Sequence, residues 1–224
     1  MGRGRSGKGK GKGKVSKITS FQDGNTTIDL SDSPLVYGGI DKALSGKARE
    51  TIENFENKRY KNRVEFSTFV TDDGTTIEEN RGGKGSVGAS RSARMTADTM
   101  SHNHPRQEGT IGGTFSSADV GNFVKYNQHT YRATAKEGTY SISKGKSFNG
   151  SGLAAAYTRF EADVISSAKK TSRSLNDKVR TGALTFEQAV KQNRINNNKS
   201  LVSLHNWLND NQKTYGYTYT LEKR

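Results

Sequence analysis

The sequence predicts an α+β fold in which a mixed, largely antiparallel sheet is flanked by helices. In some stretches apolar residues recur every three or four positions, the period of a helix with one buried face. In others they alternate with polar residues, the period of a strand. Glycine-containing turns at residues 72–74 and 136–138 separate pairs of such strands, as in hairpins. The resulting order is helix, hairpin, strand, helix, hairpin, helices and strand, a mixed α and β order.

The first predicted helix covers residues 41–60, with Asp41 as its N-cap. Its apolar residues share one face because they lie three or four positions apart. They are Leu44, Ala48, Ile52 and Phe55. Residues 64–71 alternate as a strand, Asp-Asp-Gly at 72–74 predicts a turn, and residues 75–79 form the return strand of the hairpin.

A loop rich in glycine, serine and basic residues is predicted next, followed by a short strand over residues 96–101 that ends at His102. Ser116 is the expected first residue of a helix, because Ser-x-x-Asp is a capping box. A second hairpin is predicted from strands at residues 130–135 and 139–143.

The C-terminal third is predicted to be mostly helical. A polar linker leads into a long helix over residues 153–175, which is periodic in its apolar positions. Thr185 begins another helix, with Gln188 three residues on as its capping-box partner. Residues 215–221, rich in tyrosine and threonine, are expected to form a closing strand.

The charge of the chain is strongly basic and unevenly distributed. The chain has 224 residues and a formal net charge of +14, and seven basic residues but no acid lie within residues 1–17. Glycine alternates there with lysine or arginine, so the segment has nothing to bury and is predicted to be a disordered basic tail. A nucleic-acid contact and a solubilising leader are both compatible with this composition.

Several classes of protein are excluded by composition. There is no cysteine, which rules out disulfides, thiolate metal ligands and a thiol nucleophile. No apolar run reaches membrane-spanning length, so no membrane contact through a span is expected. No apolar segment follows the charged N-terminus, so no secretory signal is expected. The sequence does not indicate an oligomeric state.

Two histidines one residue apart, His102 and His104, are the strongest candidates for chemistry. Residues i and i+2 of an extended backbone face the same side, so both imidazoles can approach one metal ion. Two histidines and one carboxylate are the ligand set of a catalytic zinc site, and Asp119 is the candidate carboxylate. Alone, a His-x-His pair is better explained by two exposed loop histidines, because the pattern is short. A capped helix that starts at Ser116 would hold Asp119 rigidly, so the capping and ligand roles are compatible.

His-Asn-His-Pro at residues 102–105, followed by Ser-x-x-Asp at 116–119, resembles the signature of the JAB/MPN (JAMM) zinc metalloprotease superfamily. The asparagine between the histidines, and the Phe-Ser before the helix, are most similar to RadC-like members and to JAB-type domains of phage head proteins and polymorphic toxins. The resemblance covers about residues 64–143 and, more weakly, 215–221. It implies a cytidine-deaminase-like core, with a mixed sheet flanked by helices and extra C-terminal helices.

The resemblance also implies roles for individual residues. His102, His104 and Asp119 would bind Zn²⁺, and Ser116 would stabilise the oxyanion of the tetrahedral intermediate. The family's general base is an upstream glutamate on an early strand, a place that Glu65 fits.

Glu65 follows the first helix and points away from Val64 and Phe66 on the predicted strand. Glu78 and Glu79, on the return strand, are its competitors for the role of base. The stretch between Pro105 and Ser116 is longer than the family's usual spacing. A loop extension, a substrate lip and a sign of lost activity are the open explanations.

These inferences divide the chain into a basic tail (1–17), a JAB/MPN-like core (18–143) and a C-terminal helical extension with a closing strand (144–224). The expected function is that of a zinc-dependent peptidase or isopeptidase-like hydrolase acting on a protein substrate. By the resemblance it is phage- or prophage-related, hence cytoplasmic in a bacterial host or associated with the virion. The alternatives are a non-catalytic virion or DNA-associated structural protein, and a nuclease-like or effector protein.

Overall fold

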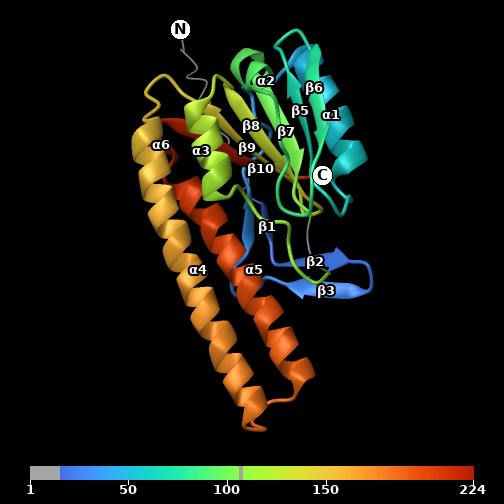
Figure 1. The fold of residues 1–224 in the computed structure, drawn as a ribbon, viewed down its shortest axis with the longest axis vertical. Coiled ribbons are helices and arrows are strands. Elements are labelled where there is room, and N and C mark those ends of the chain that lie inside the picture. The colour runs from blue at the N-terminus through green and yellow to red at the C-terminus, as the bar shows by residue number, and fades with distance from the viewer. Residues whose placement is uncertain (1–15, 106–107) are drawn as a thin grey trace, which may run out of the picture.

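The computed structural model describes residues 16–105 and 108–224 of the chain (Figure 1). Its central sheet has the spatial order β10 (Tyr217–Glu222), β9 (Thr139–Lys144), β8 (Thr130–Thr134), β7 (Thr99–Asn103), β5 (Phe66–Val70) and β6 (Thr76–Arg81). Neighbouring strands are antiparallel, except that β7 and β8 are parallel. The α+β class with a mixed, largely antiparallel sheet is therefore confirmed.

Helices cover both faces of the sheet (Figure 1). On one side lies α1 (Gly46–Arg59), and on the other lie α3 (Ser117–Lys125), α4 (Gly150–Arg180) and α5 (Phe186–Asp210). The main hydrophobic core lies between the sheet and α3–α5. It includes Phe69, Met100, Tyr131, Phe123, Tyr157 and Val202. A smaller cluster joins α1 to Val70 of β5.

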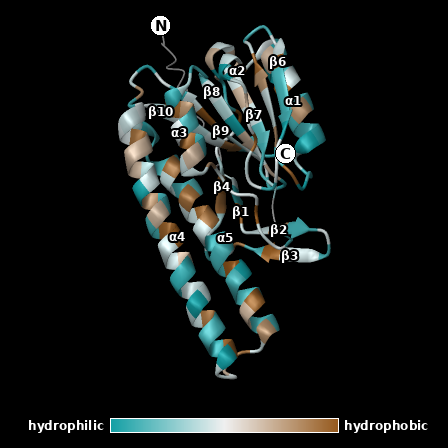
Figure 2. Ribbon diagram, viewed as in Figure 1, coloured by the Kyte–Doolittle hydropathy of each residue, from teal (hydrophilic) through white to brown (hydrophobic). Residues whose placement is uncertain are grey.

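The helices α4 and α5 form an antiparallel hairpin that extends well past the sheet (Figure 1). Figure 2 shows hydrophobic residues alternating with hydrophilic ones along both helices, as expected of amphipathic helices that pack together. The N-cap of α5 is Thr185, which forms the predicted capping box with Gln188. A short helix, α6 (Gln212–Tyr215), leads into β10. The predicted C-terminal extension thus shares its hydrophobic core with the sheet and contributes the edge strand β10.

Two small two-stranded sheets precede α1. The first pairs β1 (Ser16–Ile18) with β4 (Leu35–Tyr37), and the second pairs β2 (Ser20–Asp23) with β3 (Thr26–Asp29). Residues 1–15 of the predicted tail lie outside the described residues. Its last two residues belong to β1, so the tail prediction was wrong for them. The physical reason is that β4 provides backbone partners, with Lys17 opposite Val36.

The first helix begins five residues later than the sequence indicated. Its N-cap is Ser45, whereas the predicted cap, Asp41, is buried away from the helix. The Asp41 Oδ2 atom accepts hydrogen bonds from the hydroxyls of Ser141, at 2.6 Å, and Ser143, at 2.8 Å. Because β9 occupies this carboxylate, it cannot satisfy the free N–H groups of α1.

Neither the short α6 nor a helix before β7 was predicted from the sequence. The segment predicted as a loop before β7 contains α2 (Arg91–Thr96), and its N-cap Ser90 accepts a hydrogen bond from the N–H of Ala93 at 3.0 Å. Only Ala93 is buried in this helix, so it has no apolar periodicity to detect. The strand β7 consequently starts at Thr99 rather than at residue 96, and it runs past His102 to Asn103.

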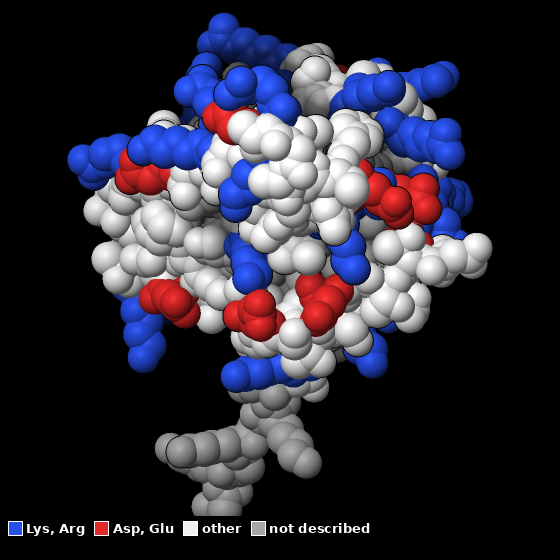
Figure 3. Space-filling model, turned by 90° about the horizontal axis from the view of Figure 1, so that it is seen from below, with Lys and Arg blue, Asp and Glu red and all other residues white. Residues whose placement is uncertain are grey.

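The described helices include none with the length and apolar content required to cross a membrane. Figure 3 shows one face of the molecule, on which basic side chains are spread widely with acidic ones among them. On this face, therefore, the lysine and arginine side chains do not form one continuous positively charged patch.

Candidate metal centre

The two histidines lie at the end of β7, beside its parallel neighbour β8. His102 is opposite Ala133 and is 2% exposed. His104 follows the strand and is held by a hydrogen bond from its N–H to the carbonyl of Thr134, at 2.9 Å. Their Nε2 atoms are 2.8 Å apart. The predicted convergence of residues i and i+2 on one side of an extended backbone is confirmed.

Asn103, between the histidines, binds the neighbouring strand instead. Its Nδ2 donates to the carbonyl of Val64, at 3.0 Å, and its Oδ1 accepts from the N–H of Phe66, at 2.7 Å. These are the two residues on either side of Glu65. The asparagine therefore fixes the backbone that carries Glu65 next to the histidines.

Asp119 reaches the histidines from the first turn of α3. Its Oδ1 is 3.4 Å from Nε2 of His102, and its Oδ2 is 3.7 Å from Nε2 of His104. The predicted capping box is present: Ser116 Oγ accepts from the N–H of Asp119 at 3.2 Å, and Asp119 Oδ2 accepts from the N–H of Ser116 at 2.8 Å. Asp119 thus caps the helix with Ser116 and lies close to both histidines at the same time, as the sequence indicated.

His102, His104 and Asp119 each offer one ligand atom, and these atoms lie within 4.8 Å of one another. In a tetrahedral zinc site with bonds of about 2.0–2.1 Å, ligand atoms are separated by roughly 3.3 Å. The two histidine–aspartate distances are close to that value, and the histidine–histidine distance is shorter. The group could therefore bind a metal ion after a small adjustment of the imidazoles.

Burial and mutual charge set the protonation of this group. Burial lowers the pKa of His102 to about 4, although Asp119 opposes the shift. Burial would also lower the pKa of His104, but the nearby carboxylate of Asp119, followed by the carbonyl of Gly113, raises that pKa above its usual value. Against the effect of burial, the two histidines hold the pKa of Asp119 well below its usual value. His102 is thus neutral near pH 7, the form in which imidazole binds metals.

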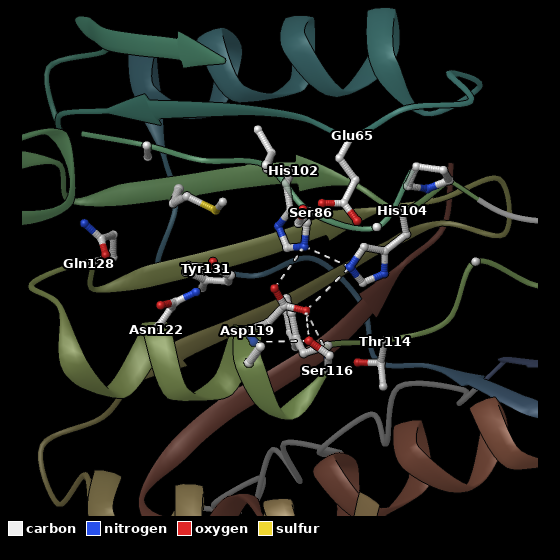
Figure 4. Close-up of a pocket in the computed structure, with 18 of the residues that line it drawn as sticks. Glu65, Ser86, His102, His104, Thr114, Ser116, Asp119, Asn122, Gln128 and Tyr131 are labelled. Atoms are coloured by element: carbon white, nitrogen blue, oxygen red, sulfur yellow. Dashed lines mark hydrogen bonds and ion pairs between the residues drawn. The ribbon is translucent and has the colours of Figure 1, made fainter. Parts of the chain in front are cut away.

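Glu65 lies in the same pocket as the metal group, just before β5 (Figure 4). Its N–H donates to the carbonyl of Gly83 at 2.7 Å, and its carbonyl accepts from the N–H of Gly82 at 2.8 Å. Figure 4 shows its carboxylate pointing towards the space beside His102 and His104. Burial, followed by the charge of Asp119, raises the pKa of Glu65, while His104 acts in the opposite direction.

The two competing glutamates lie elsewhere. Glu78 accepts hydrogen bonds from the N–H of Ser90, at 2.9 Å, and from the side chain of Asn80, at 2.6 Å. Glu79 lies 3.8 Å from a guanidinium nitrogen of Arg59. Neither lines the pocket that holds the metal group, so Glu65 is the one of the three predicted candidates that reaches the site. Glu161 of α4 also lines the pocket, and its carboxylate accepts from the N–H of Ser117 at 3.1 Å.

The pocket has a volume of about 370 Å³. It is lined by apolar side chains of the sheet, among them Phe69 and Met100, and by residues 84–87 of the glycine-rich loop. The loop was predicted from the sequence, but no role at the site was assigned to it. Its contribution depends on the backbone pairing of Gly82 and Gly83 with Glu65, which has no local signal.

The stretch before Ser116 packs tightly onto the protein over its described residues, 108–115. The buried carboxylate of Glu137 accepts from the N–H of Gly112, at 3.1 Å, and of Gly113, at 2.9 Å. The carbonyl of Gly113 then accepts from Nδ1 of His104, at 3.1 Å. Because a carbonyl can only accept, this bond places the proton of neutral His104 on Nδ1, so that Nε2 is the nitrogen able to bind a metal. The sequence missed Glu137, which is in a predicted hairpin turn.

Comparison with known proteins adds no family to this description. No protein-family model, no curated protein and no solved structure matches the chain. Function is therefore inferred from the geometry and chemistry of the site.

Proposed function

We propose that the protein is a zinc-dependent peptidase or isopeptidase-like hydrolase with a JAB/MPN-type site. One observation carries the proposal: His102, His104 and Asp119 converge in a pocket that also holds the carboxylate of Glu65. Three metal ligands and a separate, partly buried carboxylate are the groups that metal-assisted amide hydrolysis requires. The resemblance of residues 102–105 and 116–119 to the JAMM signature supports the same assignment, and the phage or prophage association rests on that resemblance alone.

Zinc is the metal that these residues fit best. Two imidazoles and one carboxylate suit zinc and neighbouring late transition metals, whereas magnesium and calcium prefer sites made of oxygen ligands. Three protein ligands leave a fourth position open, as in catalytic zinc sites. Bound here, zinc would supply a Lewis acid that polarises a carbonyl and lowers the pKa of water towards neutrality.

Glu65 would act as the general base. Its carboxylate would accept a proton from the attacking water and deliver it to the leaving amine. A carboxylate serves both steps best when its pKa lies nearer to neutrality than that of a free glutamate. The burial that raises the pKa of Glu65 acts in this direction.

Ser116 would stabilise negative charge on the substrate oxygen. Its hydroxyl lines the pocket and donates to Asp119 Oδ2 at 2.7 Å. A hydroxyl has one proton, so Ser116 must turn away from Asp119 in order to donate to an oxyanion. The backbone N–H of Ser116 continues to bind Asp119, so the carboxylate remains held while the hydroxyl turns.

The decisive experiment compares the wild type with Glu65→Gln. Both proteins should contain one zinc ion per chain, and turnover of a degenerate peptide library, read by mass spectrometry, should fall by about 10²–10⁴-fold in the variant. Glu78→Gln is the matched control and should cleave like the wild type, because Glu78 lies outside the pocket. His104→Ala should lose the zinc. Retained hydrolysis by Glu65→Gln would remove this residue from the role of base.

A second candidate is a DNA-associated or virion structural protein that does not cleave. The net charge of +14 and the seven basic residues within 1–17 favour it. If it is correct, DNA binding should weaken steeply with salt and be lost when residues 1–15 are deleted, while no peptide is cleaved. Zinc-dependent cleavage that is unaffected by this deletion would exclude a purely structural role.

A further inference from the structure

A second, larger pocket opens beside the metal group. It has a volume of about 750 Å³ and shares Lys84, His104 and Pro105 with the first pocket. The two pockets therefore adjoin at His104, one of the proposed metal ligands. A chain bound across the metal group would have one side in each pocket.

The second pocket is lined by an excess of basic side chains. Lys61, Arg63, Lys84 and Lys136 contribute four positive charges, against the carboxylates of Asp23 and Glu108. Lys136 forms an ion pair with Asp23. Arg63 and Lys84 are exposed, and neither forms an ion pair with another residue in the described part of the chain.

The first pocket has a different character. Beside the metal group it presents Phe69, Met100 and Val87, together with polar groups on α3. The first pocket is thus part apolar and part polar, with Arg94 also in its lining, whereas the second is mainly basic, and the proposed scissile bond would lie between them.

We propose that the second pocket binds an acidic segment of a polypeptide substrate, with aspartate or glutamate side chains on the side of the scissile bond that lies next to Arg63 and Lys84. This inference rests on the proposed hydrolase function and adds the substrate class. Cations that have no partner in the free protein gain ion pairs when an acidic chain binds, and their charge also accelerates association.

A polypeptide fits this pocket better than a nucleic acid does. The ring of Tyr60 carries the guanidinium of Arg224, 4.1 Å from the ring centroid, and the ammonium of Lys61, at 5.1 Å. These cations occupy the aromatic surface on which a base would stack.

The test is a binding measurement on the full-length protein with the Glu65→Gln substitution, which prevents cleavage. The probes are a fluorescein-labelled glutamate-rich peptide, a lysine-rich peptide of the same length and a single-stranded oligonucleotide, followed by fluorescence anisotropy in zinc and in chelator. The variant of the second pocket, called the groove variant below, carries Arg63→Glu and Lys84→Glu. The matched control carries Lys169→Glu and Arg173→Glu on the exposed surface of α4, so both variants change the net charge equally.

The affinity of the acidic peptide for the groove variant should be lower by about tenfold or more, since two ion pairs become repulsive contacts. Its affinity for the control variant should be close to that for the protein with Glu65→Gln alone. Equal weakening in both variants would overturn the inference, because binding would then follow net charge alone. Tighter binding of the oligonucleotide, lost in the groove variant, would assign the pocket to nucleic acid instead.

Failure of this inference is distinguishable from failure of the proposed function. If the library is cleaved with zinc but without preference for acidic residues, and the groove variant binds normally, only the acidic-substrate inference is wrong. If the acidic peptide binds through Arg63 and Lys84 but the zinc-loaded protein cleaves nothing, the hydrolase proposal is wrong, while the second pocket is still a binding site for acidic peptides.

Discussion

The carboxylate of Glu137 provides a sharp test of how the metal group is positioned. It is 2% exposed and accepts three hydrogen bonds, from the N–H groups of Gly112 and Gly113 and from the hydroxyl of Tyr140 at 2.9 Å. Gly113 has φ +82°, and a Cβ there would lie 2.7 Å from Leu201, so both the backbone conformation and the space favour glycine at this position. Its carbonyl receives the proton of His104 Nδ1. Glu137 therefore contacts the metal ligand indirectly, through the backbone of Gly113.

Glu137→Gln keeps the shape of this side chain but replaces one acceptor oxygen with an NH₂ group. One glycine N–H then loses its partner in a buried place, at a cost of about 1–3 kcal/mol in the free energy of unfolding. The Gly113 carbonyl should shift, and the metal affinity should fall by about 10- to 100-fold, the usual effect of losing an outer hydrogen bond to a ligating histidine.

The affinity is measured by zinc competition against a chromophoric chelator at pH 7, and the stability separately by urea unfolding. Tyr140→Phe is the matched control, because it removes one hydrogen bond from the same carboxylate and leaves both glycine contacts in place. It should bind zinc within about twofold of the wild type. If Glu137→Gln is destabilised but binds zinc like the wild type, the reasoning is refuted and Glu137 supports the fold alone.

Two further predictions concern stability. Arg132 is buried and forms ion pairs with Glu56, at 2.7 Å, and Glu222, at 3.0 Å. The substitution Arg132→Met should therefore lower the free energy of unfolding, measured in urea, by about 3–5 kcal/mol. The control Arg180→Met, at an exposed position, should change it little, and equal effects of the two substitutions would contradict this prediction. Burial lowers the pKa of His205 to about 4, whereas in the unfolded chain it is about 6.5. Between these two values the unfolded state binds the proton more tightly, so the free energy of unfolding falls by about 3 kcal/mol as the pH is lowered from 6.5 to 4. His205→Gln should flatten the stability curve in that window, and parallel curves would argue against a buried neutral histidine.

Most elements of the fold were predictable because their signals are local. The capping boxes at Ser116 and Thr185 predicted two helix starts correctly, and the turn residues at 72–74 and 136–138 predicted both hairpins. The errors occurred where a tertiary contact overrode a local signal. Asp41 looks like a helix cap in the sequence, but two hydroxyls of β9 bind its carboxylate.

The same division applies to the site. The sequence alone determined the pair His102 and His104 and the capped helix that carries Asp119, since both depend on spacings of two or three residues. Only the tertiary structure decided that Glu65 reaches this pocket and that Glu137 positions His104 through Gly113. These contacts join residues far apart in the chain, whose proximity depends on how β5, β7 and β8 pair. The buried pairing of Arg132 with Glu56 and Glu222 has the same origin, because hydrophobic periodicity contains no information about which charges will meet beneath a helix.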